Sequence, residues 1–161
     1  MANDLFLKVQ GADGHSKDDK HKDGWIDIDS YSFGGSQAST QYSGGGAGSG
    51  KVSFQDFHFT AKAGIECPVM MGFMCAGEHI PKVQLHAQKV GGKGKMTFLD
   101  ILLEECFITS LNMGDSAGGD EPRVQYSLNF TKSTMKYTPQ TGTGSPGATV
   151  TSTWDSKANK A

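Results

Sequence analysis

The sequence predicts a mainly β protein, an antiparallel barrel or sandwich with one short helix. Three observations lead to this fold class. Short segments of alternating apolar and polar residues recur along the chain, separated by turn signals. Glycine makes up 22 of 161 residues, about twice the usual ~7%, and it weakens helix interiors. Only one segment has apolar residues at a spacing that suits a buried helix face.

The first two predicted strands flank a polar loop. Residues 5–10 alternate in side-chain type and predict a strand. Residues 11–24 are charged and bounded by glycine, which indicates a loop. Residues 25–33 predict a second strand, in which the apolar phase slips near Asp29, as a β-bulge would cause.

A segment rich in glycine and serine follows, over 34–50. We expect a loop of seventeen residues without regular structure, a length that is often functional in a compact domain. Residues 51–60 predict a third strand with the same slip of phase. Apolar side chains would then occupy both faces of 25–33 and 51–60, which indicates oligomer interfaces, with bulges in a curved barrel as a further contribution.

The single helix is predicted over 68–76. Pro68 suits the first helical position and Gly77 suits the position just after the helix. The helix would bury a stripe formed by Val69, Met70, Phe73 and Met74.

The remaining strands are predicted over 82–90, 96–104, 106–113 and 124–137. A linker-like stretch follows Pro139, and the polar end of the chain carries one aromatic anchor, Trp154. We therefore expect a β-barrel domain over 1–138 and a polar C-terminal extension over 139–161, packed in part through Trp154.

Composition argues against several classes of partner. Fifteen basic residues and seventeen acidic residues give a net charge of −2, so no strong positive field attracts nucleic acid or an anionic membrane. The sequence contains no run of 18 apolar residues, so we expect no transmembrane helix. The N-terminus lacks the basic and apolar regions of a cleaved signal peptide, so we expect a cytoplasmic protein that leaves the cell, if at all, by another route. Three cysteines cannot all pair, and we expect reduced thiols.

No motif indicates a cofactor or a metal. Residues 45–51 match GxxxxGK, but Val52 stands where a phosphate loop has Ser or Thr, and a strand follows instead of a helix. His15 and His21 flank two aspartates, but a flexible charged loop is a poor preformed metal site, so we expect a solvated charge run.

No motif indicates catalysis either. Cys67 precedes the predicted helix, where its pKa could fall, but Pro68 removes one amide donor there. Glu104 and Glu105 would point to opposite faces of a strand and form no acid–base pair.

Several segments match one family in the same order along the chain. They are Phe6-Leu7-Lys8 with a G-x-S-x-D loop at 14–18, His21-Lys22, Tyr31-Ser32-Phe33-Gly34, the strand 51–60, the helix and exit 68–81, the strand 124–137 and the tail 154–160. Together they resemble the Hcp family, the tube subunits of the type VI secretion system. The chain departs from the family where Cys67-Pro68 replaces Ser-Pro at the helix start, and in its methionine-rich helix.

The resemblance implies an antiparallel β-barrel of two sheets with one short flanking α-helix. It also implies homohexameric rings that stack into a tube inside a contractile sheath. Contraction expels the tube, and the lumen carries small effector proteins, so the implied partners also include the sheath and spike proteins. The implied mechanism is assembly and binding, with no catalytic residues and no cofactor. The alternative is a stand-alone β-sandwich binding module, and an enzyme would need a catalytic cluster.

Two further expectations concern single sites. If Tyr31 and Phe33 point into the core, Ser32 points the other way, and the family's equivalent strand borders the channel. Ser32 is therefore the candidate for contact with the lumen and its effectors. Gly44, Gly45, Gly46 and Gly48 are candidates for a loop that reaches the next ring, because glycine permits backbone geometries that side chains block.

Overall fold

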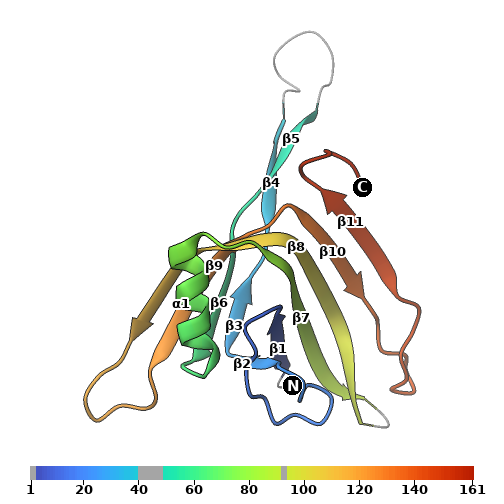
Figure 1. The fold of residues 1–161 in the computed structure, drawn as a ribbon. Helices are drawn as coiled ribbons and strands as arrows, with labels where there is room; N and C mark the ends of the chain where they lie inside the picture. The colour runs from blue at the N-terminus through green and yellow to red at the C-terminus, as the bar shows by residue number, and fades with distance from the viewer. Residues whose placement is uncertain (1–2, 40–48, 92–93) are drawn as a thin grey trace.

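Antiparallel strands form almost the whole structure, a computed structural model that describes residues 3–39, 49–91 and 94–161 (Figure 1). Sheet A contains, in spatial order, β2 (Ile26–Ile28), β1 (Asp4–Val9), β7 (Ile80–Gly91), the first part of β8 (Gly94–Gly114), β10 (Lys132–Tyr137) and β11 (Val150–Asp155). Sheet B contains the second part of β8, then β9 (Arg123–Asn129), β6 (Phe57–Lys62) and β3 (Ser30–Ser32). The predicted fold class, mainly β and antiparallel with one short helix, is confirmed.

Two long bent strands connect the sheets. The predicted strands 96–104 and 106–113 are one continuous strand, β8, with its corner at Glu105, whose φ is 52°. Its partner bends at the same level, so the predicted strand 124–137 is divided into β9 and β10. The amide of Thr131 donates to the carbonyl of Glu104 at 3.1 Å, which joins the two corners.

The slips of apolar phase mark places where the chain changes sheet. Asp29 separates β2 in sheet A from β3 in sheet B, and its amide donates to the carbonyl of Thr60 at 2.7 Å. Ile28 before the slip and Tyr31 after it therefore pack against the same core. The interpretation that the segments 25–33 and 51–60 expose apolar residues on two faces was wrong. Each segment passes from one sheet to another, and the chain rotates as it does so.

The core lies between sheets A and B, and loop 11–24 adds a second layer outside sheet A. Leu7 and Val9 of β1 point into the core and are fully buried. Phe6, on the opposite face of β1, is buried beneath the loop, where its ring stacks on His21 at 4.1 Å. The loop was predicted, but its burial of His21 contradicts a fully solvated charge run.

The helix α1 (Glu66–Ala76) connects β6 to β7 and begins two residues before the prediction. Pro68 is therefore its third residue, where the amide it lacks would have no intrahelical acceptor. Gly77 ends the helix in the left-handed conformation with φ 62°, and its amide donates to the carbonyl of Met74, as predicted. Met70 is fully buried, but Val69 is 39% exposed, so the predicted buried stripe holds only in part.

A hairpin projects from the body of the molecule, formed by β4 (Gly35–Ser39) and β5 (Ser49–Phe54) (Figure 1). The prediction of an irregular loop over 34–50 was therefore wrong for 35–39 and 49–50. The predicted strand 51–60 breaks at Gln55 and Asp56, between β5 and β6. In the extension 139–161, β11 pairs with β10 and places Trp154 opposite Ser133.

Candidate functional site

The outer face of sheet B is a wall of small polar side chains. Alternation along β6 and β9 sends Phe57, Phe59 and Leu128 into the core and sends polar residues outward. The wall is formed by Ser30, Ser32, His58, Thr60, Gln125 and Ser127, extended onto β8 by Ser110 and Asn112. These residues border a shallow cavity of about 360 Å³. None of these eight side chains is acidic or a lysine or arginine.

Hydrogen bonds between neighbouring strands hold the side chains of the polar wall in place. Ser110 Oγ donates to Ser127 Oγ at 2.8 Å, and Ser127 Oγ lies 2.8 Å from His58 Nδ1. Ser30 and Thr60 share a hydroxyl–hydroxyl bond of 2.6 Å between β3 and β6. Such a surface offers hydrogen-bond donors and acceptors to a bound polypeptide. It carries no fixed charge, so it does not favour a polypeptide of either positive or negative charge.

Ser32 lies on this wall, exposed at the end of β3, with His58 as its partner in register. Tyr31 and Phe33, its neighbours in sequence, pack against the core. The geometry on which the prediction for Ser32 depended is therefore present. Gly44, Gly45, Gly46 and Gly48, together with most of the GxxxxGK match, lie outside the described residues.

Both edges of sheet B lack a partner strand among the described residues. β3 pairs only with β6, and Phe107–Gly114 of β8 pairs only with β9. Unpaired edges expose backbone amides and carbonyls that another strand can bind. The rim beside the wall is charged, with an ion pair between Arg123 and Asp29.

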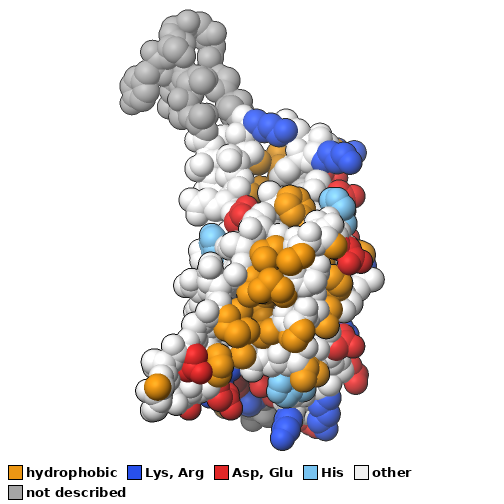
Figure 2. Space-filling model, turned by 60° about the vertical axis from the view of Figure 1, so that its left-hand side comes forward, with side chains coloured by type: hydrophobic (Ala, Val, Ile, Leu, Met, Phe, Trp, Pro, Cys, Tyr) orange, Lys and Arg blue, Asp and Glu red, His pale blue; other side chains and the backbone are white. Residues whose placement is uncertain are grey.

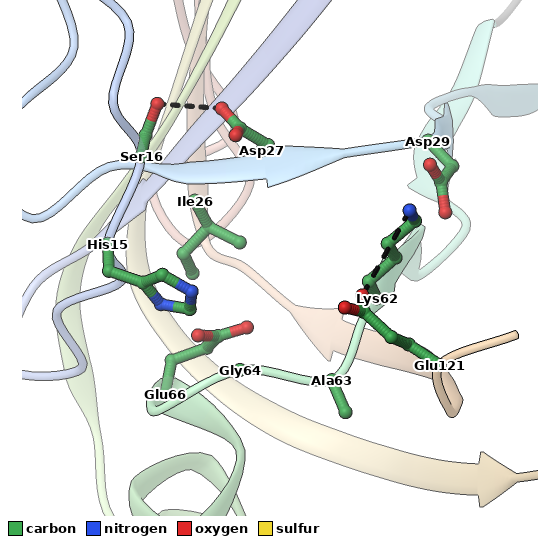
Figure 3. A pocket seen from close by; sticks show the side chains of 10 residues that line it. All are labelled: His15, Ser16, Ile26, Asp27, Asp29, Lys62, Ala63, Gly64, Glu66 and Glu121. Carbon is green, nitrogen blue, oxygen red and sulfur yellow. Dashed lines mark hydrogen bonds and ion pairs between the residues drawn. The ribbon is translucent and has the colours of Figure 1, made fainter.

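A second cavity, of about 290 Å³, lies where α1 begins, and carboxylates predominate in it (Figure 3). Glu66 is 2% exposed, and its carboxylate and the ring of His15 point toward each other. Ser16 Oγ donates to Asp27 Oδ1 at 2.7 Å on one wall, and Lys62 lies 4.0 Å from Glu121 on another.

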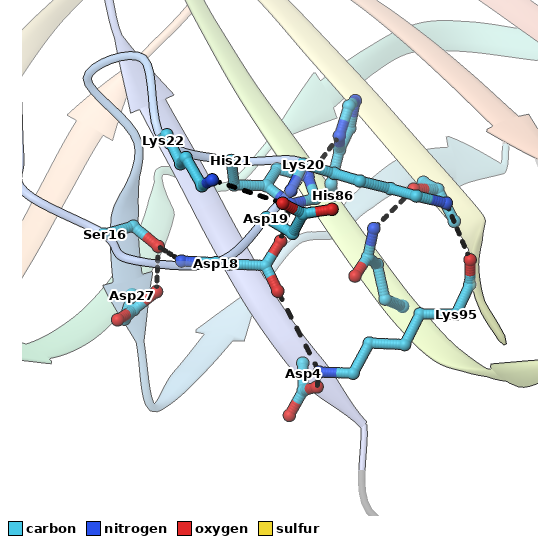
Figure 4. Close-up of polar contacts among 12 residues, drawn as sticks. Asp4, Ser16, Asp18, Asp19, Lys20, His21, Lys22, Asp27, His86 and Lys95 are labelled. Carbon is cyan, nitrogen blue, oxygen red and sulfur yellow. Dashed lines mark hydrogen bonds and ion pairs between the residues drawn. The ribbon is translucent and has the colours of Figure 1, made fainter.

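A buried polar network fastens loop 11–24 to sheet A (Figure 4). His21 is 2% exposed; its Nδ1 lies 2.8 Å from Asp18 Oδ1 and its Nε2 lies 3.0 Å from His86 Nδ1. Because Asp18 accepts, the network assigns the His21 proton to Nδ1 and makes His86 Nδ1 the donor to Nε2. His86 Nε2 lies 3.3 Å from Asp100 Oδ2 but lacks the alignment of a hydrogen bond.

The pKa values of His21, Asp18 and Asp100 in this network are all lowered. Burial lowers the pKa of His21, and its contact with Asp18 opposes this only in part. The hydrogen bond with His21 lowers the pKa of Asp18 against the opposing effect of burial. Burial alone would raise the pKa of Asp100, but the contacts with His86 and Gln84 leave it below its ordinary value. The network therefore favours neutral His21 beside ionised carboxylates.

The cysteines occupy structural positions or the surface. Cys67 accepts a hydrogen bond from the hydroxyl of Tyr126 at 3.0 Å inside the core. Burial raises the pKa of Cys106 to about 12, which makes it unreactive. Cys75 is exposed on α1, and all three are free thiols.

Within 3–39, 49–91 and 94–161, no three His, Cys, Asp or Glu side chains are grouped as metal ligands would be. The described helix α1 is too short to cross a membrane.

Sequence reasoning found one residue of the polar wall and missed most of the others. The alternation His58, Thr60 on one strand and Gln125, Ser127 on another was visible as a pattern. That these two strands are neighbours in one sheet depends on pairings between residues far apart in sequence, such as His58 with Ser127, 69 positions apart, and local patterns do not encode them.

Comparison with known proteins agrees with this architecture. The family described as "Type VI secretion system effector, Hcp" matches residues 6–137. The chain is 35% identical to protein hcp1 of Pseudomonas aeruginosa over 160 residues, covering 99% of this chain and 98% of that protein.

Solved structures extend the comparison to the fold. Hcp1 from Salmonella typhimurium is similar at 30% identity with a TM-score of 0.82, covering 99% of each chain. A type six secretion system protein is similar at 25% identity with a TM-score of 0.90, again covering 99% of each chain. By sequence and by fold, the chain belongs to the Hcp family, the secreted tube and effector proteins of the type VI secretion system.

Proposed function

We propose that the chain assembles into closed homohexameric rings, that the rings stack into a tube, and that the polar wall of sheet B lines the lumen. Contraction of a sheath expels the tube, guided by spike proteins, and the lumen carries small effector proteins. The chain acts by assembly and binding rather than by catalysis. The number six rests on the family resemblance.

The observation that carries this proposal is sheet B, which joins a polar face to two unpaired edges. Its four strands alternate in direction, so β3 at one edge runs antiparallel to β8 at the other. In a ring, β3 of one subunit can pair with Phe107–Gly114 of the next. Because sheet B has an even number of strands, neighbouring strands remain antiparallel across this junction. The polar face would then continue around the channel.

The particle mass of the purified protein tests assembly. We expect light scattering after size-exclusion chromatography to give six times the chain mass at micromolar concentration, and electron microscopy to show rings with an open centre. A monomer would refute the ring and favour the alternative, a stand-alone β-sandwich binding module.

Ser32→Gln tests the lumen contact. The longer side chain would crowd the channel at one position in every subunit. The contacts between subunits would be unaffected, because Ser32 is proposed to face the channel. We expect rings of unchanged mass and thermal stability that retain less effector on co-purification. Ser145→Gln, at an exposed serine outside the wall, is the control. Equal effector on both variants would refute the role of Ser32, and failure to assemble would place it at a subunit interface.

Three further parts of the proposal concern the rest of the chain. Gly44, Gly45, Gly46 and Gly48 contribute to contacts between stacked rings. Residues 1–138 form the barrel domain, and 139–161 form an extension attached through β11 and Trp154. The protein is made in the cytoplasm and exported without a cleaved signal peptide, so the secreted form should have the mass of the intact chain.

A further inference from the structure

The eight side chains of the polar wall form two rows that cross all the strands of sheet B. In register, the first row consists of Ser32 on β3, His58 on β6, Ser127 on β9 and Ser110 on β8. The second row consists, on the same strands in the same order, of Ser30, Thr60, Gln125 and Asn112. We call the first row the histidine row. Of the eight side chains only the imidazole of His58 can change its charge in the physiological range of pH.

The hydrogen bonds of the histidine row determine the tautomer of His58. Ser110 Oγ donates to Ser127 Oγ, which leaves the Ser127 proton for His58 Nδ1, 2.8 Å away. His58 Nδ1 therefore accepts, and the ring proton is assigned to Nε2. Ser127 is only 8% exposed, so a buried hydroxyl orients an exposed ring. No group of the described residues hydrogen-bonds His58 Nε2, which can donate to a ligand on the wall.

Hydrogen bonds and charge, rather than apolar contact, determine what these eight side chains can bind. Hydrophobic side chains gather on a different surface, over α1, where Val69 and Met71 are exposed (Figure 2). On the wall, His58 offers an imidazole N–H, and Gln125 and Asn112 offer amide N–H groups. Carboxylate and carbonyl oxygens accept hydrogen bonds from all of these donors.

Uptake of a proton by His58 changes the charge of the histidine row without breaking it. An imidazolium donates from both nitrogens, so Nδ1 then donates to Ser127 Oγ, and Ser127 turns its own proton toward Ser110. The row keeps its hydrogen bonds because hydroxyl groups both donate and accept. His58 Nε2 becomes a charged donor, and a hydrogen bond from a charged donor to a carboxylate is about twice as strong as a neutral one.

Fixed charges lie at the borders of the two rows. Asp56 precedes His58 by two residues, and Thr109 Oγ1 donates to its carboxylate at 2.7 Å. Two ion pairs lie at the opposite border: Asp29 with Arg123 and Lys62 with Glu121. Each pair is neutral, so the carboxylate of Asp56 is the charge in excess. It opposes an acidic polypeptide while His58 is neutral, and protonated His58 offsets it at the centre of the wall.

We propose that the histidine row binds carboxylate groups of an effector polypeptide, and that protonation of His58 strengthens this binding. The inference rests on the proposed ring and lumen, and it names the chemistry of the cargo and its dependence on pH. In a closed ring the histidine rows of successive subunits form one belt around the channel. A polypeptide that contacts several subunits gains from each of them, so a modest effect at one His58 is multiplied.

Two capped peptides of opposite charge test the inference on the intact particle. One alternates aspartate with serine and the other alternates lysine with serine, and neither changes charge between about pH 8 and about pH 5.5. Both carry a dye that does not respond to pH, and fluorescence anisotropy measures their binding. We expect the acidic peptide to bind about tenfold more tightly at the lower pH, and the basic peptide to gain no affinity.

Two substitutions of His58 separate its charge from its shape. His58→Gln keeps hydrogen-bonding atoms but does not titrate, so it should bind the acidic peptide equally at both pH values. His58→Lys is charged at both pH values and should bind the peptide tightly at both. His15→Gln, at an exposed histidine outside the wall, is the matched control and should keep the pH dependence of the wild type.

Proton uptake gives a second readout. Because protonation and carboxylate binding strengthen each other, binding of the acidic peptide near about pH 6.5 should draw protons from the buffer. Calorimetry in buffers of different ionisation enthalpy measures this uptake. We expect it for the wild type and for His15→Gln, and we expect it to be absent for His58→Gln.

The outcomes separate the inference from the ring itself, because particle mass is measured at both pH values. Particles of ring mass that bind the acidic peptide equally at both pH values would overturn the inference and leave the ring in place. Unchanged pH dependence in His58→Gln would do the same. A monomer at pH 8 would overturn the ring. If the ring dissociates only at the lower pH, His58→Lys at pH 8 decides: tight binding supports the inference, and no binding overturns it.

Discussion

His21 is buried although its neighbours in sequence are charged. Its ring lies between Phe6 and Trp25, with ring centroids at 4.1 and 4.6 Å, and both ring nitrogens have partners. The imidazole thus packs against two aromatic rings and also connects Asp18 to His86 through its two nitrogens. Next to it, Lys20 Nζ of the loop donates to the carbonyl of Lys95 in β8 at 2.9 Å, so His21 is one of several polar contacts between loop 11–24 and sheet A.

The lowered pKa of His21 makes folding stability depend on pH. The unfolded chain protonates His21 near its ordinary pKa of 6.5, whereas the folded chain resists until lower pH, so the unfolded state binds more protons in between. The stabilisation is present above 6.5 and is lost as pH falls through that window. We expect the free energy of unfolding, measured in urea, to decrease from pH 8 to pH 5.

His21→Asn is the variant for this prediction. It should cost about 1–3 kcal/mol at pH 8, because it leaves buried polar partners unsatisfied. It should also show a weaker decrease toward pH 5, because the titrating group is gone. An unchanged slope would mean that other groups cause the acid sensitivity.

At the level of elements, the corners between the sheets decide the path of the chain. Asp29 and Glu105 each mark a point where a strand leaves sheet A and enters sheet B. At Glu105 the backbone has a positive φ, which L-residues rarely adopt. The corner turns the apolar side of the strand so that it keeps facing one core.

Substitutions at Glu105 test the cost of this corner. A left-handed conformation costs an L-residue roughly 1–2 kcal/mol, and more for a β-branched side chain. Glu105 already bears this cost, so Glu105→Gly should raise the free energy of unfolding by up to about 1 kcal/mol, whereas Glu105→Val should lower it, because a β-branched side chain is still less compatible with a positive φ. Thermal denaturation of both variants measures this, and equal losses would show that the carboxylate rather than the backbone matters.

The β4–β5 hairpin belongs to the same scale. Deletion of 43–48 keeps the residues of both strands, Gly35–Ser39 and Ser49–Phe54. We expect rings of the mass set by six shortened chains, but impaired tube formation and secretion, because the contacts between rings are lost. Electron microscopy and the amount of protein in the culture medium are the measurements. Normal secretion would count against a stacking role for Gly44, Gly45, Gly46 and Gly48.

For the whole molecule, the edges of sheet B that are proposed to join subunits bind through backbone groups. Neither β3 nor Phe107–Gly114 of β8 contains a charged residue. The net charge of the chain is only −2, so repulsion between copies is small.

Ring assembly should therefore resist salt. In about 1 M NaCl, where the screening length is roughly 3 Å, ion pairs at a surface weaken but apolar contacts persist. We expect the particle mass to stay the same between about 0.05 M and about 1 M NaCl. Dissociation at high salt would indicate that ion pairs hold the ring.

The sequence by itself determined the fold class, the helix end at Gly77 and the outward direction of Ser32. Each depends on residues close together in the chain: alternation, a glycine that accepts positive φ, and the two aromatic residues beside Ser32. The segments that resemble the Hcp family also lie in the sequence, and the comparisons confirm the family.

Only the tertiary structure decided how these pieces combine. It showed that the slips of phase are crossings between sheets, that His21 is buried against Phe6, and that residues 35–39 pair with 49–54. It also placed His58 beside Ser127 and left Val69 and Met71 of α1 exposed. These features depend on contacts between residues far apart in the chain, and such contacts form only when burial of the shared core outweighs the entropy of closing long loops.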